Sequence, residues 1–107
     1  MQMGTHDELL ARLELGLKRY NHGVRVDDDT REWGTPRNSW MEMAREELLD
    51  AVIYVIADYI RMGKERGEND ENELITHYAK DLKHIKSEKH HLILQSLLDL
   101  LSIEESE

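Results

Sequence analysis

Three carboxylates stand close together at the start of an apolar segment. Residues 41–61 read MEMAREELLDAVIYVIADYIR, in which Glu46, Glu47 and Asp50 come just before the longest apolar part. On a helix, residues three and four apart share one face, so Asp50 can lie beside either glutamate. Oxygen ligands of this kind suit Mg²⁺ or Mn²⁺. The spacing therefore allows two interpretations, a divalent-metal site or a solvated acidic face.

Polar residues directly before this segment are candidates for binding a substrate. Arg37 and Asn38 immediately precede it, and an arginine fork can bind a phosphate group through two hydrogen bonds. Glu42 is better explained by helix capping, because Ser39-Trp-Met-Glu42 has the form of a capping box. Arg37 and Asn38 are therefore the expected substrate-binding residues, and Glu42 is not counted as a metal ligand.

Other titratable residues give weaker signals. Asp58 follows Glu47 by about 16 Å along a helix axis, so it can serve an extended site but cannot share one ion with Glu47. A helical face at four- and three-residue spacing is shared by His77, Asp81 and His84, which makes a metal site geometrically possible. The segment has no HExxH motif and no third imidazole in register, so the signal is weak. His90 is expected at the surface or in an interface.

Four segments show helical periodicity and helix-starting signals. The first starts at the capping box Thr5-His-Asp-Glu8 and ends near residues 21–23. The second starts at Asn38 or Ser39 and ends at Gly63 or Gly67. Asp70 can cap a third, and Ser87 can start a fourth, although residues 70–103 also fit one bent helix. The pattern predicts an all-α fold, a small bundle of about four helices completed by homo-oligomerisation through leucine-rich faces.

Length, charge and cysteine content limit the possible functions. Residues 1–107 fit one small domain. A formal net charge of −9 argues against nucleic acid and anionic membranes as partners. The chain has no cysteine, signal-peptide pattern or apolar run of membrane-spanning length. We therefore expect a cytoplasmic protein, and its small core favours assembly into a homodimer or homotetramer.

The acidic segment resembles a known enzyme family. Residues 46–55, EELLDAVIYV, are similar to the second metal-binding helix of the MazG-like all-α nucleotide pyrophosphohydrolases, where an ExxD pair precedes an apolar run that often bears a tyrosine. Glu47 and Asp50 fill that pair. The preceding loop, with Gly34, Pro36 and Asn38, resembles compact phage-encoded relatives, including the MazZ branch linked to deoxypurine triphosphate turnover. The similarity covers about residues 34–61.

The resemblance implies hydrolysis of a nucleoside triphosphate, (d)NTP, to the monophosphate and pyrophosphate with Mg²⁺ or Mn²⁺ as cofactor. It makes Glu46, Glu47 and Asp50 the expected metal ligands, Glu46 the candidate base, and a purine deoxynucleotide (dGTP or dATP) the expected substrate. The family's EExxE motif on an earlier helix is missing. Either the overlapping EExxD forms a condensed site, or further ligands come from Glu42, Asp58, another helix or a second subunit.

Two other functions fit the same sequence. One is a non-enzymatic helical interaction or assembly protein that binds a partner through the leucine-rich C-terminal half. The other is a related pyrophosphohydrolase that acts on phosphoribosyl-ATP, which keeps the chemistry and changes the substrate.

Overall fold

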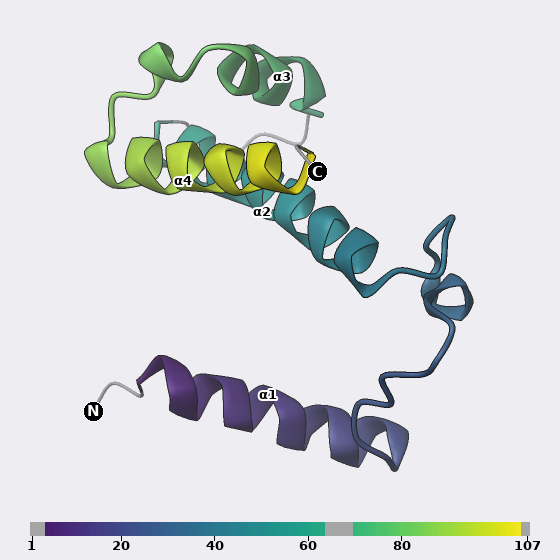
Figure 1. Cartoon of the computed structure of the whole chain (residues 1–107). Coiled ribbons are helices and arrows are strands. Elements are labelled where there is room, and N and C mark those ends of the chain that lie inside the picture. Colours follow the sequence, from purple (N-terminus) through teal and green to yellow (C-terminus); the bar gives the residue numbers. More distant parts are fainter. Residues whose placement is uncertain (1–3, 64–69, 106–107) are drawn as a thin grey trace.

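All regular secondary structure in the described part of the chain is helical. The computed structural model describes residues 4–63 and 70–105 (Figure 1). Two short 3₁₀ turns, η1 and η2, accompany four α-helices. The elements are α1 (Thr5–Tyr20), η1 (Thr30–Trp33), α2 (Trp40–Met62), α3 (Asn72–Lys80), η2 (Leu82–His84) and α4 (Glu88–Glu105). The predicted all-α fold with about four helices is confirmed, and the segment that fitted one helix or two is divided into α3 and α4.

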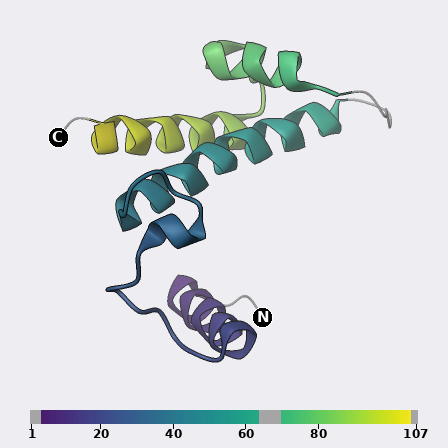
Figure 2. The same ribbon diagram turned by 90° about the vertical axis from the view of Figure 1, so that its right-hand side faces the viewer.

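The apolar core lies where α2, α3 and α4 meet. On α2, Val52, Ile56 and Ile60 recur every four residues and are buried, as expected for one helix face. Ile56 and Leu94 are fully buried. Both views show α4 and α3 beside the C-terminal part of α2 (Figures 1 and 2). The buried hydrophobic residues are Val52, Ile56, Ile60, Ile85, Leu94 and Leu101.

The predicted end signals agree with the structure for α2 and the end of α1. Ser39 is the N-cap of α2, and its Oγ accepts a hydrogen bond from the amide of Glu42 at 3.1 Å. Asn21 closes α1 in the left-handed conformation at φ 63°, which asparagine tolerates better than most residues. Gly63 is the C-cap of α2, while the alternative, Gly67, lies outside the described residues.

Two other cap predictions were wrong. Gly4, not Thr5, precedes α1, and no side chain caps that end, so Thr5 is the first helical residue. Glu71, not Asp70, precedes α3, again without a side-chain cap. Each error is one residue, which is the usual uncertainty at a helix end.

Helix α1 is set apart from the other three helices (Figures 1 and 2). It contributes no buried residue, and four of its leucines at helical spacing are about half exposed, Leu9, Leu10, Leu13 and Leu17. Residues 21–39, which include η1, connect it to the start of α2. None of the described helices is long and apolar enough to cross a membrane.

Candidate functional site

The predicted carboxylates lie on the exposed side of α2. Glu46, Glu47 and Asp50 are all exposed. They precede the buried positions of the helix, which begin at Val52. Glu47 and Asp50 point away from the face that carries Val52 and Ile56, because about 100° separates successive helix residues. The structure therefore keeps these three side chains available to solvent and to a ligand.

The carboxylates do not form a closed metal site on their own. In the described ranges, 4–63 and 70–105, no three His, Asp or Glu side chains are grouped so that they could hold a metal ion. Their oxygen ligands still fit Mg²⁺, which commonly binds one or two carboxylates and completes its shell with waters and substrate phosphates. The residues present thus fit a partial coordination shell to which a substrate contributes.

An apolar cavity of about 230 Å³ lies between α1, the connecting loop and the start of α2. Aromatic contacts shape it: the rings of Tyr20 and Trp33 meet edge to face at 5.8 Å, and the indole Nε1 of Trp40 donates to the carbonyl of Val26 at 2.9 Å. Flat aromatic walls with few polar groups are typical of a pocket for a planar ring. Its remaining lining includes Arg12, Leu13, Gly16, Leu17, His22, Asp28 and Met43.

One face of α2 joins this cavity to the carboxylates. Trp40 and Met43 line the cavity, and Glu47 and Asp50 continue the same stripe at four- and three-residue spacing. With a rise of about 1.5 Å per residue, Glu47 lies about 6 Å and Asp50 about 10 Å beyond Met43 along the axis. An elongated ligand with a planar ring at one end and anionic groups at the other matches this layout.

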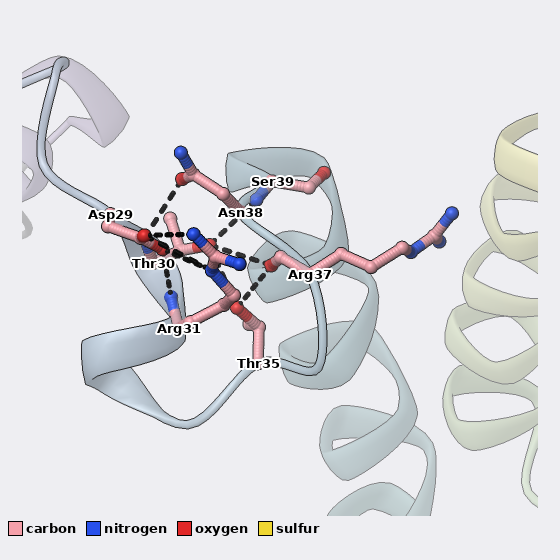
Figure 3. A network of polar contacts seen from close by, with 7 residues as sticks. All are labelled: Asp29, Thr30, Arg31, Thr35, Arg37, Asn38 and Ser39. Atoms are coloured by element: carbon pink, nitrogen blue, oxygen red, sulfur yellow. Dashed lines mark hydrogen bonds and ion pairs between the residues drawn. The ribbon is translucent and has the colours of Figure 1, made fainter.

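A buried hydroxyl network fixes the loop before α2 (Figure 3). Thr30 is fully buried and Thr35 nearly so. Their hydroxyls lie 2.8 Å apart and both approach the carbonyl of Arg37, at 3.0 and 2.6 Å. Thr30 Oγ1 accepts from the amide of Ser39 at 2.7 Å, and the amide of Thr30 donates to Oδ1 of Asn38 at 3.0 Å. Buried polar groups are costly without partners, so this network holds the loop in one conformation.

The two predicted substrate-binding residues have different surroundings. The side-chain oxygen of Asn38 is used inside the loop network, which gives Asn38 a structural role. The Arg37 side chain is 84% exposed, and its Nε donates to Glu42 at 3.0 Å. Glu42 thus pairs with Arg37, while only the serine half of the predicted capping box is formed. Of the two residues, Arg37 has the side chain that a phosphate can reach.

Arg31 of the same loop has a local partner. Arg31 donates from Nε to both carboxylate oxygens of Asp29, at 3.0 and 3.1 Å. Hydrogen bonds from the Arg31 side chain and amide hold the pKa of Asp29 below its usual range. Arg31 therefore compensates the acidic run of the loop, as its neighbours in the sequence suggest.

One contact between α2 and α4 was not predicted from the sequence. His90 is buried, and its Nε2 lies 2.7 Å from Oδ2 of Asp58, while its Nδ1 lies 2.6 Å from the hydroxyl of Ser87. The hydrogen bond with His90 is the main cause that lowers the pKa of Asp58. His90 was expected at the surface or in an interface, and the structure instead buries it against Asp58 of α2. The sequence did not indicate this contact, because a partner 32 residues away leaves no periodic signal.

His77 of α3 and His84 of η2 lie near each other without forming a metal group. The rings of His77 and His84 are stacked at 4.8 Å, and Nε2 of His84 is 3.9 Å from Oδ2 of Asp81. These side chains are among the described residues in which no metal-holding group of three is present. The spacing that suggested a site is better explained by packing of two imidazoles.

Comparison of the chain with family models, curated proteins and solved structures gave no match. The function is therefore inferred from the residues themselves and from the resemblance of residues 34–61.

Proposed function

We propose that this protein is a metal-dependent nucleoside triphosphate pyrophosphohydrolase that converts a (d)NTP to the monophosphate and pyrophosphate. The observation that carries the proposal is the shared face of α2, where the aromatic cavity at Trp40 and Met43 continues into exposed Glu47 and Asp50. The resemblance of residues 46–55 to the MazG-like metal-binding helix supports the same residues independently of that geometry.

The proposal gives each part of this surface a role. The base of the nucleotide lies in the cavity against Trp33 and Trp40, because aromatic rings stack favourably. Arg37 binds phosphate through its exposed guanidinium. Glu47 and Asp50, with Glu46 beside them, would hold Mg²⁺ or Mn²⁺ together with the substrate phosphates. When bound, the ion supplies charge neutralisation of the triphosphate and a lower pKa for a bound water.

The reaction itself is a hydrolysis. A water adds at phosphorus, the bond that links the α- and β-phosphoryl groups breaks, and pyrophosphate leaves. Glu46 takes the proton of the attacking water, since it stands beside the metal-binding pair and is exposed. An acidic protein of net charge −9 needs cations to bind an anionic substrate, and a metal requirement meets that need.

Two finer points belong to the same proposal. A homodimer or homotetramer supplies the metal ligands that α2 alone lacks, because an oligomer brings carboxylates of other subunits within reach. A purine deoxynucleotide, dGTP or dATP, is the proposed substrate, on the resemblance to compact phage-encoded relatives.

A panel of ribo- and deoxynucleotides with Mg²⁺ or Mn²⁺ tests the function. We expect equal amounts of monophosphate and pyrophosphate, no orthophosphate, and loss of the activity when EDTA removes the metal. Phosphoribosyl-ATP is included so that the related substrate is distinguished. The proposal fails if no nucleotide is hydrolysed, or if the Asp50→Ala variant keeps full activity.

The exposed leucines of α1 favour one alternative, an interaction protein without enzymatic activity. In that case Glu47→Gln would have no effect and metal would not change thermal stability. Leu97 and Leu98 are unsuitable for testing partner binding, because both pack against the core. Exposed Leu92, Leu100 and Ile103 of α4 are the better positions for aspartate substitutions.

A further inference from the structure

A hydroxyl, an imidazole and a carboxylate lie in a row where α4 begins beside α2. The Oγ of Ser87 is 2.6 Å from Nδ1 of His90, and Nε2 of the same ring is 2.7 Å from Oδ2 of Asp58. Ser87 directly precedes α4, and His90 lies in the first turn of that helix. Asp58 comes from α2, which runs beside α4 (Figures 1 and 2). Serine hydrolases activate their nucleophile through the same order of groups.

The hydrogen bonds select one tautomer of the neutral His90 ring. A carboxylate only accepts, so Nε2 carries the proton that it donates to Asp58, and Nδ1 is left to accept from the Ser87 hydroxyl. The imidazole is buried, whereas the Asp58 side chain is 56% exposed and also lies 3.9 Å from Arg61. The bond with His90 lowers the pKa of Asp58, so the carboxylate is ionised at neutral pH. His90 is therefore oriented as a base for Ser87.

The start of α4 also provides donors for a developing negative charge. The Oγ of Ser87 accepts from the amide of His90 at 3.3 Å, and its carbonyl accepts from the amide of His91 at 2.9 Å. The amides of Glu88 and Lys89 have no acceptor among the described residues. Some esterases place the nucleophile just before a helix, because the amide that follows it then stabilises the oxyanion. The amides of Glu88 and Lys89 stand in that position.

An apolar cleft borders the imidazole. The cleft has a volume of about 410 Å³ and is lined by Tyr59, Ile60, Met62, Gly63, Leu74 and Tyr78. The ring of Tyr59 lies 5.7 Å from the ring of His90. The Tyr59 hydroxyl accepts from the amide of Lys86 at 2.9 Å, one residue before Ser87. Tyr59 thus connects the cleft to the serine and its base, and an apolar acyl group suits the lining.

We propose that Ser87, His90 and Asp58 form a second catalytic site, which hydrolyses carboxylic esters of apolar acids. Ser87 and His90 are its catalytic residues, and Asp58 is a positioning residue that acts through His90. None of the three has a role in the proposed nucleotide hydrolysis, so this site goes beyond that function.

The reaction needs only the ester and water. Ser87 Oγ bonds to the carbonyl carbon while its proton passes to Nδ1 of His90, and the amides of Glu88 and Lys89 bind the oxyanion. The ester carbon–oxygen bond then breaks, and His90 gives the proton to the leaving alkoxide. Water attacks the acyl group on Ser87 with His90 again as base. The proton finally passes to Ser87 Oγ as the carboxylic acid leaves.

Active-site labelling tests the nucleophile in the unaltered chain. A fluorophosphonate reacts with activated serines, and peptide mass spectrometry locates the adduct. We expect an adduct at Ser87 that EDTA does not prevent. Ser39 is the internal control and should stay unmodified, because its Oγ also caps a helix but pairs with the amide of Glu42 rather than with an imidazole. No adduct at Ser87, or equal modification of both serines, would overturn the proposal.

Substitution separates catalysis from helix capping. Asparagine is as good an N-cap as serine but has no hydroxyl, so Ser87→Asn should remain folded by circular dichroism. Its hydrolysis of p-nitrophenyl acetate should fall to the rate given by free imidazole at the same concentration. Asp58→Asn should lower kcat/KM about a hundredfold or more, mainly through kcat, because the amide favours the wrong tautomer of His90. Wild-type ester hydrolysis by folded Ser87→Asn would refute the catalytic role.

EDTA distinguishes this site from the carboxylates of α2. The steps at Ser87 use no metal ion, so ester hydrolysis should proceed at the same rate in EDTA, whereas nucleotide hydrolysis should stop. Ester hydrolysis that is lost in EDTA would contradict the proposal. If nucleotides are not hydrolysed at all while Ser87 is labelled and cleaves the ester, the function proposed for α2 fails and the ester site stands.

Discussion

The two halves of this molecule are held together by different kinds of contact. Helices α2, α3 and α4 surround an apolar core that includes fully buried Ile56 and Leu94. The loop between α1 and α2 has no such core, and its shape depends on the hydroxyls of Thr30 and Thr35 and on edge contacts of aromatic rings. The helices α2, α3 and α4 therefore provide stability, whereas α1 and the loop that follows it present a binding surface.

Helix α2 belongs to both halves, because its opposite faces have different tasks. One face carries Val52 and Ile56 into the core, and the other carries Met43 to the cavity and Glu47 and Asp50 to solvent. A helix rigidly packed on one side is a firm support for groups on the other. Substitutions on each face should therefore have separable effects on stability and on binding.

The largest effect is expected in the core. Ile56→Ala removes a fully buried side chain and should lower the free energy of unfolding by about 2–5 kcal/mol, since it leaves a cavity. Urea unfolding followed by circular dichroism measures it. Leu15→Ala on α1, where Leu15 is 45% exposed, is the control and should change stability by about 0.5 kcal/mol or less. Equal effects of the two would refute the division into halves.

A smaller and more local effect is expected in the loop. Thr30→Val keeps the shape of the side chain but removes the hydroxyl that pairs with the amide of Ser39 and the carbonyl of Arg37. Leaving buried groups unpaired costs about 1–3 kcal/mol. Hydrogen exchange should therefore speed up at the amide of Ser39 while the core of α2 keeps its protection. Thr76→Val, at an exposed threonine of α3, should change neither the exchange rate at Ser39 nor the protection of the α2 core.

The smallest effect depends on pH and concerns the contact between α2 and α4. The hydrogen bond with His90 lowers the pKa of Asp58 in the folded chain. Such a carboxylate stabilises the fold above its unfolded pKa of about 4 and loses that contribution as the pH falls through the folded value. The melting temperatures of wild type and Asp58→Asn should therefore differ near neutral pH and converge once the pH falls below the lowered pKa of Asp58.

The partner residue provides the control for this pH dependence. In a His90→Ala background the hydrogen bond is absent, so Asp58→Asn should change the melting temperature by a similar amount at every pH. A difference between wild type and Asp58→Asn that grows as the pH falls would contradict the assigned role of Asp58.

The sequence predicted the helices well because their signals are local. Apolar spacing in α2 and the Ser39 cap depend only on residues within a few positions of each other. The exposure of Glu46, Glu47 and Asp50 follows from the same spacing, since they lie off the apolar stripe. Boundaries such as Gly4 and Glu71 were missed by one residue, where neighbouring cap residues compete.

Contacts between residues far apart in the sequence could not be predicted from these local signals. His90 meets Asp58 across two helices, and the cavity is built from α1, the loop and α2 together. Thr30 was not singled out, although it is the centre of the loop network, because a single threonine in an acidic loop has no pattern that indicates burial. Such features depend on how the elements pack, which periodicity does not encode.

Pyrophosphate release by three matched variants tests the central claim most directly. With a purine deoxynucleoside triphosphate and Mn²⁺, Glu47→Gln and Asp50→Asn should each lower kcat/KM at least a hundredfold, whereas Glu73→Gln, an exposed carboxylate at the start of α3, should retain wild-type activity. All three should melt like the wild type, since the three side chains are exposed. Wild-type activity in both α2 variants would contradict the assignment of this face as the active site.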